Sequence, residues 1–124
     1  EDHPEVAAAC DVILCNCYPF WEGYAREQAL SEMQAMVQRV RVAAPGKPVI
    51  ISESGWPARG SARGAAQPSL QEALRFFIDS VQWAQREGVA LFHFAAFDEA
   101  WKLGEEGDVG AAWGLWDANG HAKF

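Results

Sequence analysis

The stretch KPVIISESGWP, Lys47 to Pro57, decides the fold and also raises the question of function. A mostly apolar run from Pro48 to Ser52 leads into a carboxylate at Glu53, and a Ser-Gly-Trp-Pro turn follows at once. Apolar runs of this length that end in turn residues are typical of buried strands. The apolar run disfavours the alternative, a plain surface acid, and Glu53 is therefore a candidate functional group.

Two further stretches have the same character. DVILCNCY, Asp11 to Tyr18, and VALFHFAAF, Val89 to Phe97, are apolar at nearly every position. Continuous apolar runs predict strands of a parallel sheet that is covered on both faces. Within the third run, His93 is predicted to be a hydrogen-bonded core histidine and not a catalyst.

Helical patterns separate these strands. Residues 25–42 carry apolar side chains at helical spacing, which predicts a helix that ends at APGKP. Residues 3–10 are predicted to be the end of another helix. A third helix is predicted over 69–87, where Ser69 and Glu72 form a capping box and Gly88 ends the helix. Phe76, Phe77 and Trp83 are predicted core residues of this helix. Its inner stripe is predicted to include Leu70, Leu74, Phe77, Val81 and Ala84.

The order strand, helix, strand, helix, strand predicts an α/β protein with a parallel sheet. Two architectures fit this order: a doubly wound open sheet, and a section of a (β/α)8 barrel. A nucleotide-binding version of the first is disfavoured, because no glycine-rich phosphate loop follows any of the strands. In both architectures functional side chains gather at the carboxyl ends of the strands.

Composition narrows the class of partner. The 124 residues fit one domain, and their net charge of −7 argues against nucleic acid or an anionic membrane as partner. A neutral partner such as a sugar is compatible with this charge. No stretch reaches the roughly 18 apolar residues of a membrane span, and no signal peptide opens the sequence. The three cysteines have no metal or redox spacing and are predicted to be buried thiols. No metal and no cofactor is expected.

Each predicted strand ends in a polar or aromatic cluster, and parallel neighbours would place these clusters on one rim. Two carboxylates, a phenol, an amine and several indoles around a cleft are typical of a glycosidase. The three clusters are residues 16–21 (NCYPFW), 53–56 (ESGW) and 97–102 (FDEAWK).

Several of these residues have a second interpretation. Glu99 and Lys102 are three positions apart, which fits a solvated helical ion pair as well as a pair in a site. Asn16 is either a buried amide that the backbone satisfies or a substrate contact. The acidic residues Glu105, Glu106 and Asp108 are predicted to form a solvated loop.

Four stretches closely resemble the closing third of glycoside hydrolase family 17. These are NCYPFW at 16–21, VIISESGWP at 49–57, FHFAAFDEAWK at 92–102 and WGLWDANGHAKF at 113–124. The resemblance implies a (β/α)8 barrel that acts on β-1,3-glucans with retention of configuration, by hydrolysis or by transglycosylation. It also implies a secreted, periplasmic or cell-envelope location.

The resemblance further implies roles for single residues. Glu53 would be the nucleophile at the end of the penultimate barrel strand, and Tyr18 would hydrogen-bond to it and help hold it ionised. Glu99 would be a supporting acid, and Lys102 would belong to the same charged network. The candidate substrate-binding residues are Asn16, Phe20, Trp21, Trp56, Phe97 and Trp101.

One part of the family pattern is missing. The family's proton donor is a Glu that follows an Asn, and no Asn-Glu pair occurs in the 124 residues. A full barrel also takes about 250 residues and eight strands. We therefore expect residues 1–124 to be the C-terminal section of the domain, about three βα units, whose partner is a missing N-terminal half-barrel or a second copy. The alternative functions are a non-catalytic glucan-binding module and a half-barrel assembly module.

Overall fold

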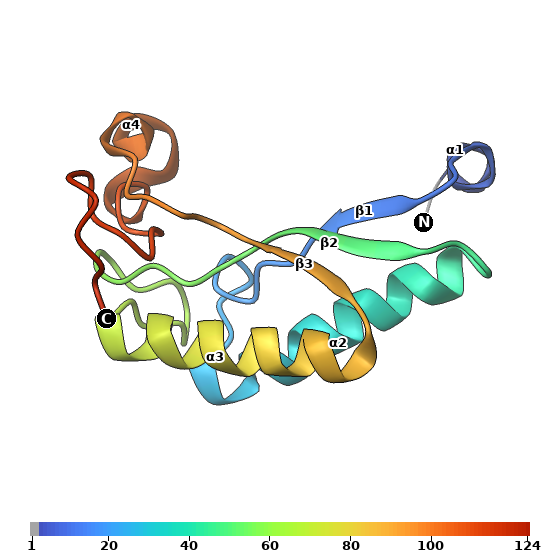
Figure 1. The fold of residues 1–124 in the computed structure, drawn as a ribbon, viewed down its shortest axis with the longest axis horizontal. Helices are drawn as coiled ribbons and strands as arrows, with labels where there is room; N and C mark the ends of the chain where they lie inside the picture. The colour runs from blue at the N-terminus through green and yellow to red at the C-terminus, as the bar shows by residue number, and fades with distance from the viewer. Residues whose placement is uncertain (1–2) are drawn as a thin grey trace.

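The computed structural model describes residues 3–124, which fold around a three-stranded parallel sheet of order β1-β2-β3 (Figure 1). The strands run from the end of the molecule near α1 toward the end that carries α4 and the C-terminal segment. The predicted α/β fold with a parallel sheet is confirmed. The elements are α1 (Pro4–Ala9), β1 (Ile13–Asn16), α2 (Arg26–Ala43), β2 (Val49–Ser54), α3 (Leu70–Glu87), β3 (Ala90–His93), the 3-10 turn η1 (Ala100–Lys102), α4 (Leu103–Glu106) and the 3-10 turn η2 (Gly107–Val109).

Both long helices lie on the same face of the sheet (Figure 1). The strands are neighbours in sequence order, so two crossovers of the same hand deliver both connecting helices to one side. A section of a barrel carries its helices on one face, and so does one half of a doubly wound sheet. The winding of these three strands is therefore compatible with either architecture.

The core lies between the sheet and the two helices. From α2 it takes Ala29, Met33 and Val37, and from β2 it takes Ile51. The predicted cap of α3 is confirmed, since Ser69 Oγ accepts from the Glu72 amide at 3.1 Å and Gly88 ends the helix with φ +63°. No helix within residues 3–124 is long and apolar enough to cross a membrane.

The buried side of α3 differs from the predicted stripe. The prediction of core positions is right for Phe76 and Trp83, but Leu70 is exposed and Phe77 is only partly buried. The helix is turned so that its bulkiest residues face the core, where Phe76 packs against Trp56 with ring centroids 5.8 Å apart. The fully buried residues of α3 are Ala73, Phe76, Ser80, Trp83 and Ala84.

The strands are shorter than predicted and covered on one face only. Regular pairing covers Ile13–Asn16 and Ala90–His93, because the ladder shifts register near the carboxyl ends. The other face, which we call the open face, consists of Leu14, Ile50, Ala90 and Phe92. Leu14 is 59% exposed and Phe92 62% exposed. Within residues 3–124 one of the two apolar faces therefore stays uncovered, as expected for a section of a larger domain.

Gly55 lets the ends of β2 and β3 approach closely. A Cβ at this position would lie 1.9 Å from the carbonyl oxygen of Phe94, a distance that no side chain can adopt. The Phe94 amide donates to the carbonyl of Ser54 at 2.8 Å across the same junction. Glycine is therefore required immediately after Ser54, and the two strand ends that frame the site are held together.

His93 is partly buried, and its Nδ1 is buried without a hydrogen-bond partner among residues 3–124, so the prediction of a hydrogen-bonded core histidine is wrong. Its ring packs edge-on against Phe77 with centroids 4.9 Å apart. Burial, with a smaller contribution from the charge of Lys123, lowers the pKa of His93 from 6.5 to about 4.

This depressed pKa predicts a loss of stability in acid. Between pH 6.5 and 4 the unfolded chain binds a proton at His93 that the folded chain does not bind. The contribution of neutral His93 to the free energy of unfolding is therefore complete above pH 6.5 and is lost as the pH falls toward 4. We expect His93→Phe to reduce the loss over this interval by on the order of 2 kcal/mol. Urea unfolding followed by tryptophan fluorescence at several pH values measures it, with His121→Phe on the exposed surface as control. Parallel pH profiles for the wild-type and His93→Phe chains would contradict the prediction.

Candidate active site

Glu53, near the carboxyl end of β2, receives two hydrogen bonds on one oxygen. Asn16 Nδ2 donates to Glu53 Oε2 at 3.0 Å, and the Tyr18 hydroxyl donates to the same oxygen at 2.9 Å. Hydrogen bonds to a charged acceptor are stronger than neutral ones and fix the orientation of the carboxylate. Within residues 3–124, Oε1 receives no such bond and remains available for a ligand.

A register irregularity brings Asn16 beside Glu53. Cys15 pairs with Ile51, but the next residue of β1, Asn16, pairs with Glu53 and so skips Ser52. The Ser52 hydroxyl then donates to Asn16 Oδ1 at 2.7 Å, which fixes the orientation of the amide and turns Nδ2 toward the carboxylate. The prediction left Asn16 open between a backbone-satisfied amide and a substrate contact. The structure places it between Ser52 and the proposed nucleophile.

Tyr18 is held as a hydrogen-bond donor by its surroundings. Its ring packs edge-on against Phe94 and Trp113, at centroid distances of 5.9 and 5.6 Å. Burial, its hydrogen bond to Glu53 and the charges of Glu53 and Glu106 raise the pKa of Tyr18 well above the ordinary value of 10. The phenol therefore stays protonated and donates a hydrogen bond to Glu53.

A pocket of about 430 Å³ opens beside Glu53. Tyr18, Trp21, Glu53 and Lys102 line it, so four of the predicted site residues come together.

The sequence analysis missed the remaining lining residues. Phe94 follows directly on the β3 run, and alternation along that strand is the signal that could have found it. Glu105, Glu106 and Asp108 were predicted to form a solvated loop. Glu105 and Asp108 are exposed, as predicted, but Glu106 is partly buried, and Glu105 and Glu106 lie in the short helix α4. The lining is Tyr18, Trp21, Glu53, Phe94, Lys102, Glu105 and Glu106.

Lys102 and Glu99 form an ion pair in which the lysine is buried and the glutamate side chain is 32% exposed. Lys102 is a buried residue, and its ammonium pairs with the Glu99 carboxylate. The same Nζ lies 3.9 Å from the ring centroid of Phe94, a cation–π distance. Of the two alternatives left open by the spacing, the burial of Lys102 and its place in the pocket lining favour a pair in a site.

The predicted sugar-stacking residues divide into three groups. Trp21 lines the pocket. Phe20 and Trp56 are 0% and 1% exposed, so the prediction that they stack on sugar is wrong for this arrangement; the Trp56 indole instead donates to the Gln67 carbonyl at 3.0 Å. Phe97 and Trp101 are exposed but do not line the pocket, and Phe97 packs against Trp116.

The C-terminal segment is fastened to the residues that follow β3. Asp98 Oδ1 accepts from Lys123 Nζ at 2.8 Å and from the Gly114 amide at 2.9 Å. Gly114 is required at this contact, because a Cβ there would lie 2.3 Å from the Asp98 nitrogen. The neighbouring residue Glu99 is thereby given a fixed backbone position.

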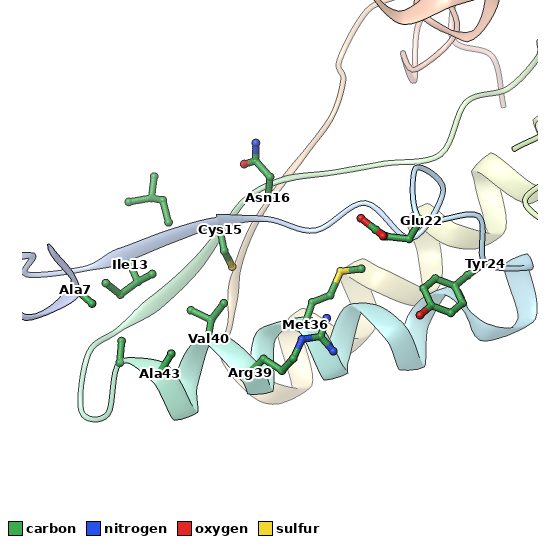
Figure 2. A pocket seen from close by; sticks show the side chains of 12 residues that line it. Ala7, Ile13, Cys15, Asn16, Glu22, Tyr24, Met36, Arg39, Val40 and Ala43 are labelled. Carbon is green, nitrogen blue, oxygen red and sulfur yellow. The ribbon is translucent and has the colours of Figure 1, made fainter. Parts of the chain in front are cut away.

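A second hollow, of about 540 Å³, lies along the edge of β1 above α2 (Figure 2). Cys15 points into it, toward Met36 and Val40, whereas Asn16 points to the opposite side of the strand. The sulfur atoms of Cys15 and Cys17 are 3.9 Å apart, and all three cysteines are free thiols. No group of three or more potential metal ligands occurs among the described residues. Glu53 does not line this hollow, although Asn16, which donates to Glu53, does.

Sequence comparison relates the chain to fungal glucan-active proteins. The family of the BtgE/BtgC glycoside hydrolase domain matches residues 1–114. A glucan 1,3-beta-glucosidase of Arthroderma benhamiae is 36% identical over 125 residues, covering 90% of this chain and 41% of that protein. A glucan 1,3-beta-glucosidase of Schizosaccharomyces pombe is 30% identical, covering 96% of this chain and 39% of that protein. The chain thus spans about two fifths of the length of these relatives.

Structural comparison gives the same picture. The crystal structure of a glycoside hydrolase family 17 beta-1,3-glucanosyltransferase from Rhizomucor miehei superposes with a TM-score of 0.89 at 29% identity. The match covers 95% of this chain and 43% of that one. An active-site mutant of a Rhizomucor miehei beta-1,3-glucanosyltransferase in complex with laminaritriose superposes with the same TM-score at 28% identity.

The ion pair between Glu99 and Lys102 leads to a prediction about stability. Glu99→Gln leaves the Lys102 ammonium buried without its counter-ion and is expected to cost about 1–3 kcal/mol of unfolding free energy. The double variant Glu99→Gln/Lys102→Met should recover part of that loss, because no unpaired charge remains. Chemical denaturation measures all three proteins, with Glu105→Gln as the exposed neighbour. If Glu99→Gln costs no more than Glu105→Gln, the pair is energetically a surface pair.

Proposed function

Since the chain belongs to the BtgE/BtgC glycoside hydrolase domain family, we propose that it carries the nucleophile side of a retaining β-1,3-glucan-active site. The observation that supports this most directly is the Glu53 carboxylate, which lines a pocket and receives two donors on Oε2 alone. The proposed reaction is hydrolysis or transglycosylation of β-1,3-linked glucose. The names of the relatives, glucosidase and glucanosyltransferase, support both outcomes.

We propose that residues 1–124 form the last three strands of a (β/α)8 barrel. The parallel order β1-β2-β3 with both long helices on one face supports this, as does the superposition on part of the Rhizomucor structure. In a closed barrel the open face would become the packed interior, and β1 and β3 would each gain a neighbouring strand. The preceding strands of the same domain are the proposed partner.

In the proposed mechanism Oε1 of Glu53 attacks the anomeric carbon. The new C–O bond forms as the bond from that carbon to the glycosidic oxygen breaks, and a carboxylic acid gives its proton to the leaving oxygen. In the second half, water or a hydroxyl of another sugar loses a proton to that carboxylate, bonds to the anomeric carbon and releases Glu53. Asn16 and Tyr18, which donate to Oε2, would hold the carboxylate in position through both steps.

The proton donor is proposed to lie in the preceding part of the domain, because the family's Asn-Glu pair does not occur in these residues. Glu99 is proposed as a supporting acid, which would fix the Lys102 ammonium at the wall of the pocket. The ammonium would add positive potential beside Glu53. Trp21 is the proposed stacking face inside the pocket, and Phe97 and Trp101 are proposed contacts for more distant glucose units.

A second candidate function is a half-barrel assembly module. The observation that favours it is the open face, where Leu14 and Phe92 leave apolar surface in water next to two unpaired strand edges. Such surface favours association. A non-catalytic glucan-binding module would also keep the pocket but would not form a covalent intermediate.

An activated substrate tests the role of Glu53 in the chain itself. Dinitrophenolate leaves without protonation, so 2,4-dinitrophenyl 2-deoxy-2-fluoro-β-laminaribioside needs a nucleophile but no acid. We expect intact-mass spectrometry to detect one glycosyl adduct, mapped by peptide digestion to Glu53. Glu53→Gln should form none, whereas Glu99→Gln should still react.

The outcomes separate the candidate functions. No adduct on the wild-type chain, or an adduct that persists in Glu53→Gln, would overturn the nucleophile assignment. Laminarin, whose leaving oxygen needs a proton, should release no reducing sugar with this chain alone. Measurable release would mean that another carboxylate, such as Glu99, acts as the donor.

The half-barrel proposal predicts self-association of the isolated chain. We expect light scattering to give a concentration-dependent mass above the 13.6 kDa of one copy. Leu14→Lys and Phe92→Lys should shift the mass toward the monomer, because they charge the open face. Val42→Lys, at an exposed apolar position of α2, is the matched control and should not. A monodisperse wild-type monomer that melts cooperatively would contradict the proposal.

A further inference from the structure

Arg63, in the loop between β2 and α3, directs its side chain at a single residue of the candidate site. Its Nε donates to the carbonyl oxygen of Trp21, and its guanidinium carbon lies 5.4 Å from the centroid of the Trp21 ring, a cation–π distance. Trp21 lines the pocket that contains Glu53, whereas Arg63 does not line it. Any effect of Arg63 on this pocket is therefore transmitted through the tryptophan.

The loop that carries Arg63 is docked on the turn that follows Trp21. The Ala65 amide donates to the Gly23 carbonyl at 2.9 Å. Gly64, with φ +58°, passes so close to this turn that a Cβ on it would lie 3.1 Å from the Gly23 carbonyl oxygen. The backbone that presents the guanidinium is therefore fixed relative to Trp21.

The other ring contacts of Trp21 are aromatic and come from the core. Its centroid lies 5.3 Å from that of Phe20 and 5.5 Å from that of Trp113, and both of these neighbours are buried. They leave the indole half-buried, and Arg63 adds a polar contact to its ring. A half-buried side chain that is free to change rotamer must be ordered when a ligand binds, and this ordering costs free energy. A guanidinium held against the ring reduces that cost before the ligand arrives.

We propose that Arg63 is a positioning residue, which holds the Trp21 indole in the orientation that stacks on a glucosyl unit beside Glu53. This proposal rests on the proposed function, because it takes a β-1,3-linked glucan as the ligand. Arg63 preorganises the binding of that ligand and leaves the chemical step unchanged, since it does not line the pocket in which the bonds form and break.

The positioning role predicts a change in binding without a change in reactivity. With 2,4-dinitrophenyl 2-deoxy-2-fluoro-β-laminaribioside, Arg63→Ala should raise the inactivation constant KI by about 3- to 10-fold and leave the limiting rate of adduct formation within about twofold. Arg63→Lys keeps a cation near the ring and should recover part of the affinity. Arg63→Ala should have no further effect on KI in a Trp21→Ala chain. Arg59→Ala is the matched charge control, because Arg59 lies in the same loop but donates to the Ala111 carbonyl at 3.1 Å.

A spectroscopic measurement follows the indole itself. In a chain that carries 5-fluorotryptophan, each tryptophan gives a fluorine NMR signal, and Trp21→Phe identifies the signal of Trp21. We expect Arg63→Ala to shift or broaden this signal in the free chain, because the ring loses a fixed neighbour. The signal of Trp83, a buried residue of α3, should stay in place and shows that the variant is folded.

The outcomes separate this role from the proposed function. If the wild-type chain forms no adduct, the proposed function is overturned and the role of Arg63 with it. If the wild-type chain reacts and Arg63→Ala has the same KI as Arg59→Ala, only the role of Arg63 is overturned. An equal rise of KI in the Trp21→Ala chain, or an unmoved Trp21 signal, would also overturn it, since Arg63 would then act through another group.

Discussion

The arrangement of the site depends on two donors that meet at one carboxylate oxygen. Asn16 and Tyr18 come from β1 and the residues after it, and both reach Oε2 of Glu53 on β2. This requires a slip in the pairing of the two strands, so that Asn16 lies opposite Glu53 and not opposite Ser52. A regular ladder would direct Asn16 and Glu53 to opposite faces of the sheet. The register irregularity thus places the Asn16 amide beside the Glu53 carboxylate at the end of the two strands.

The same principle governs the junction between β2 and β3. Gly55 allows the backbone after Ser54 to touch the Phe94 carbonyl, which brings Phe94 beside Tyr18 and under the Lys102 ammonium. The aromatic rings give the ion pair a poorly hydrated environment, where its field is less screened than in water. Strand pairing, aromatic packing and electrostatics therefore act on one small region. The helices support this region from the opposite face of the sheet.

The sequence was sufficient to predict the parallel sheet, the two long helices and the position of Glu53, because these depend on local periodicity and on strand ends. It was also sufficient to predict Tyr18, Trp21 and Lys102 as site residues, and all three line the pocket. It failed where an outcome depends on long-range packing. The burial of Phe20 and Trp56 follows from the collapse of aromatic rings around Trp113, and nothing in their spacing distinguishes them from Trp21. Glu106 resembles its acidic neighbours in sequence, and nothing in its spacing marks the one carboxylate whose oxygen is buried.

The contact between Asp98 and Lys123 joins the distal chain to the rim beside Glu99. The intervening residues 117–122 form an exposed turn in which Asp117 caps the amides of Asn119 and His121. A cut in this turn would leave Lys123 held to Asp98 and to the carbonyls of Ala112 and Leu115 by non-covalent contacts alone. The covalent continuity of an exposed turn thus supports the ion pair beside Glu99.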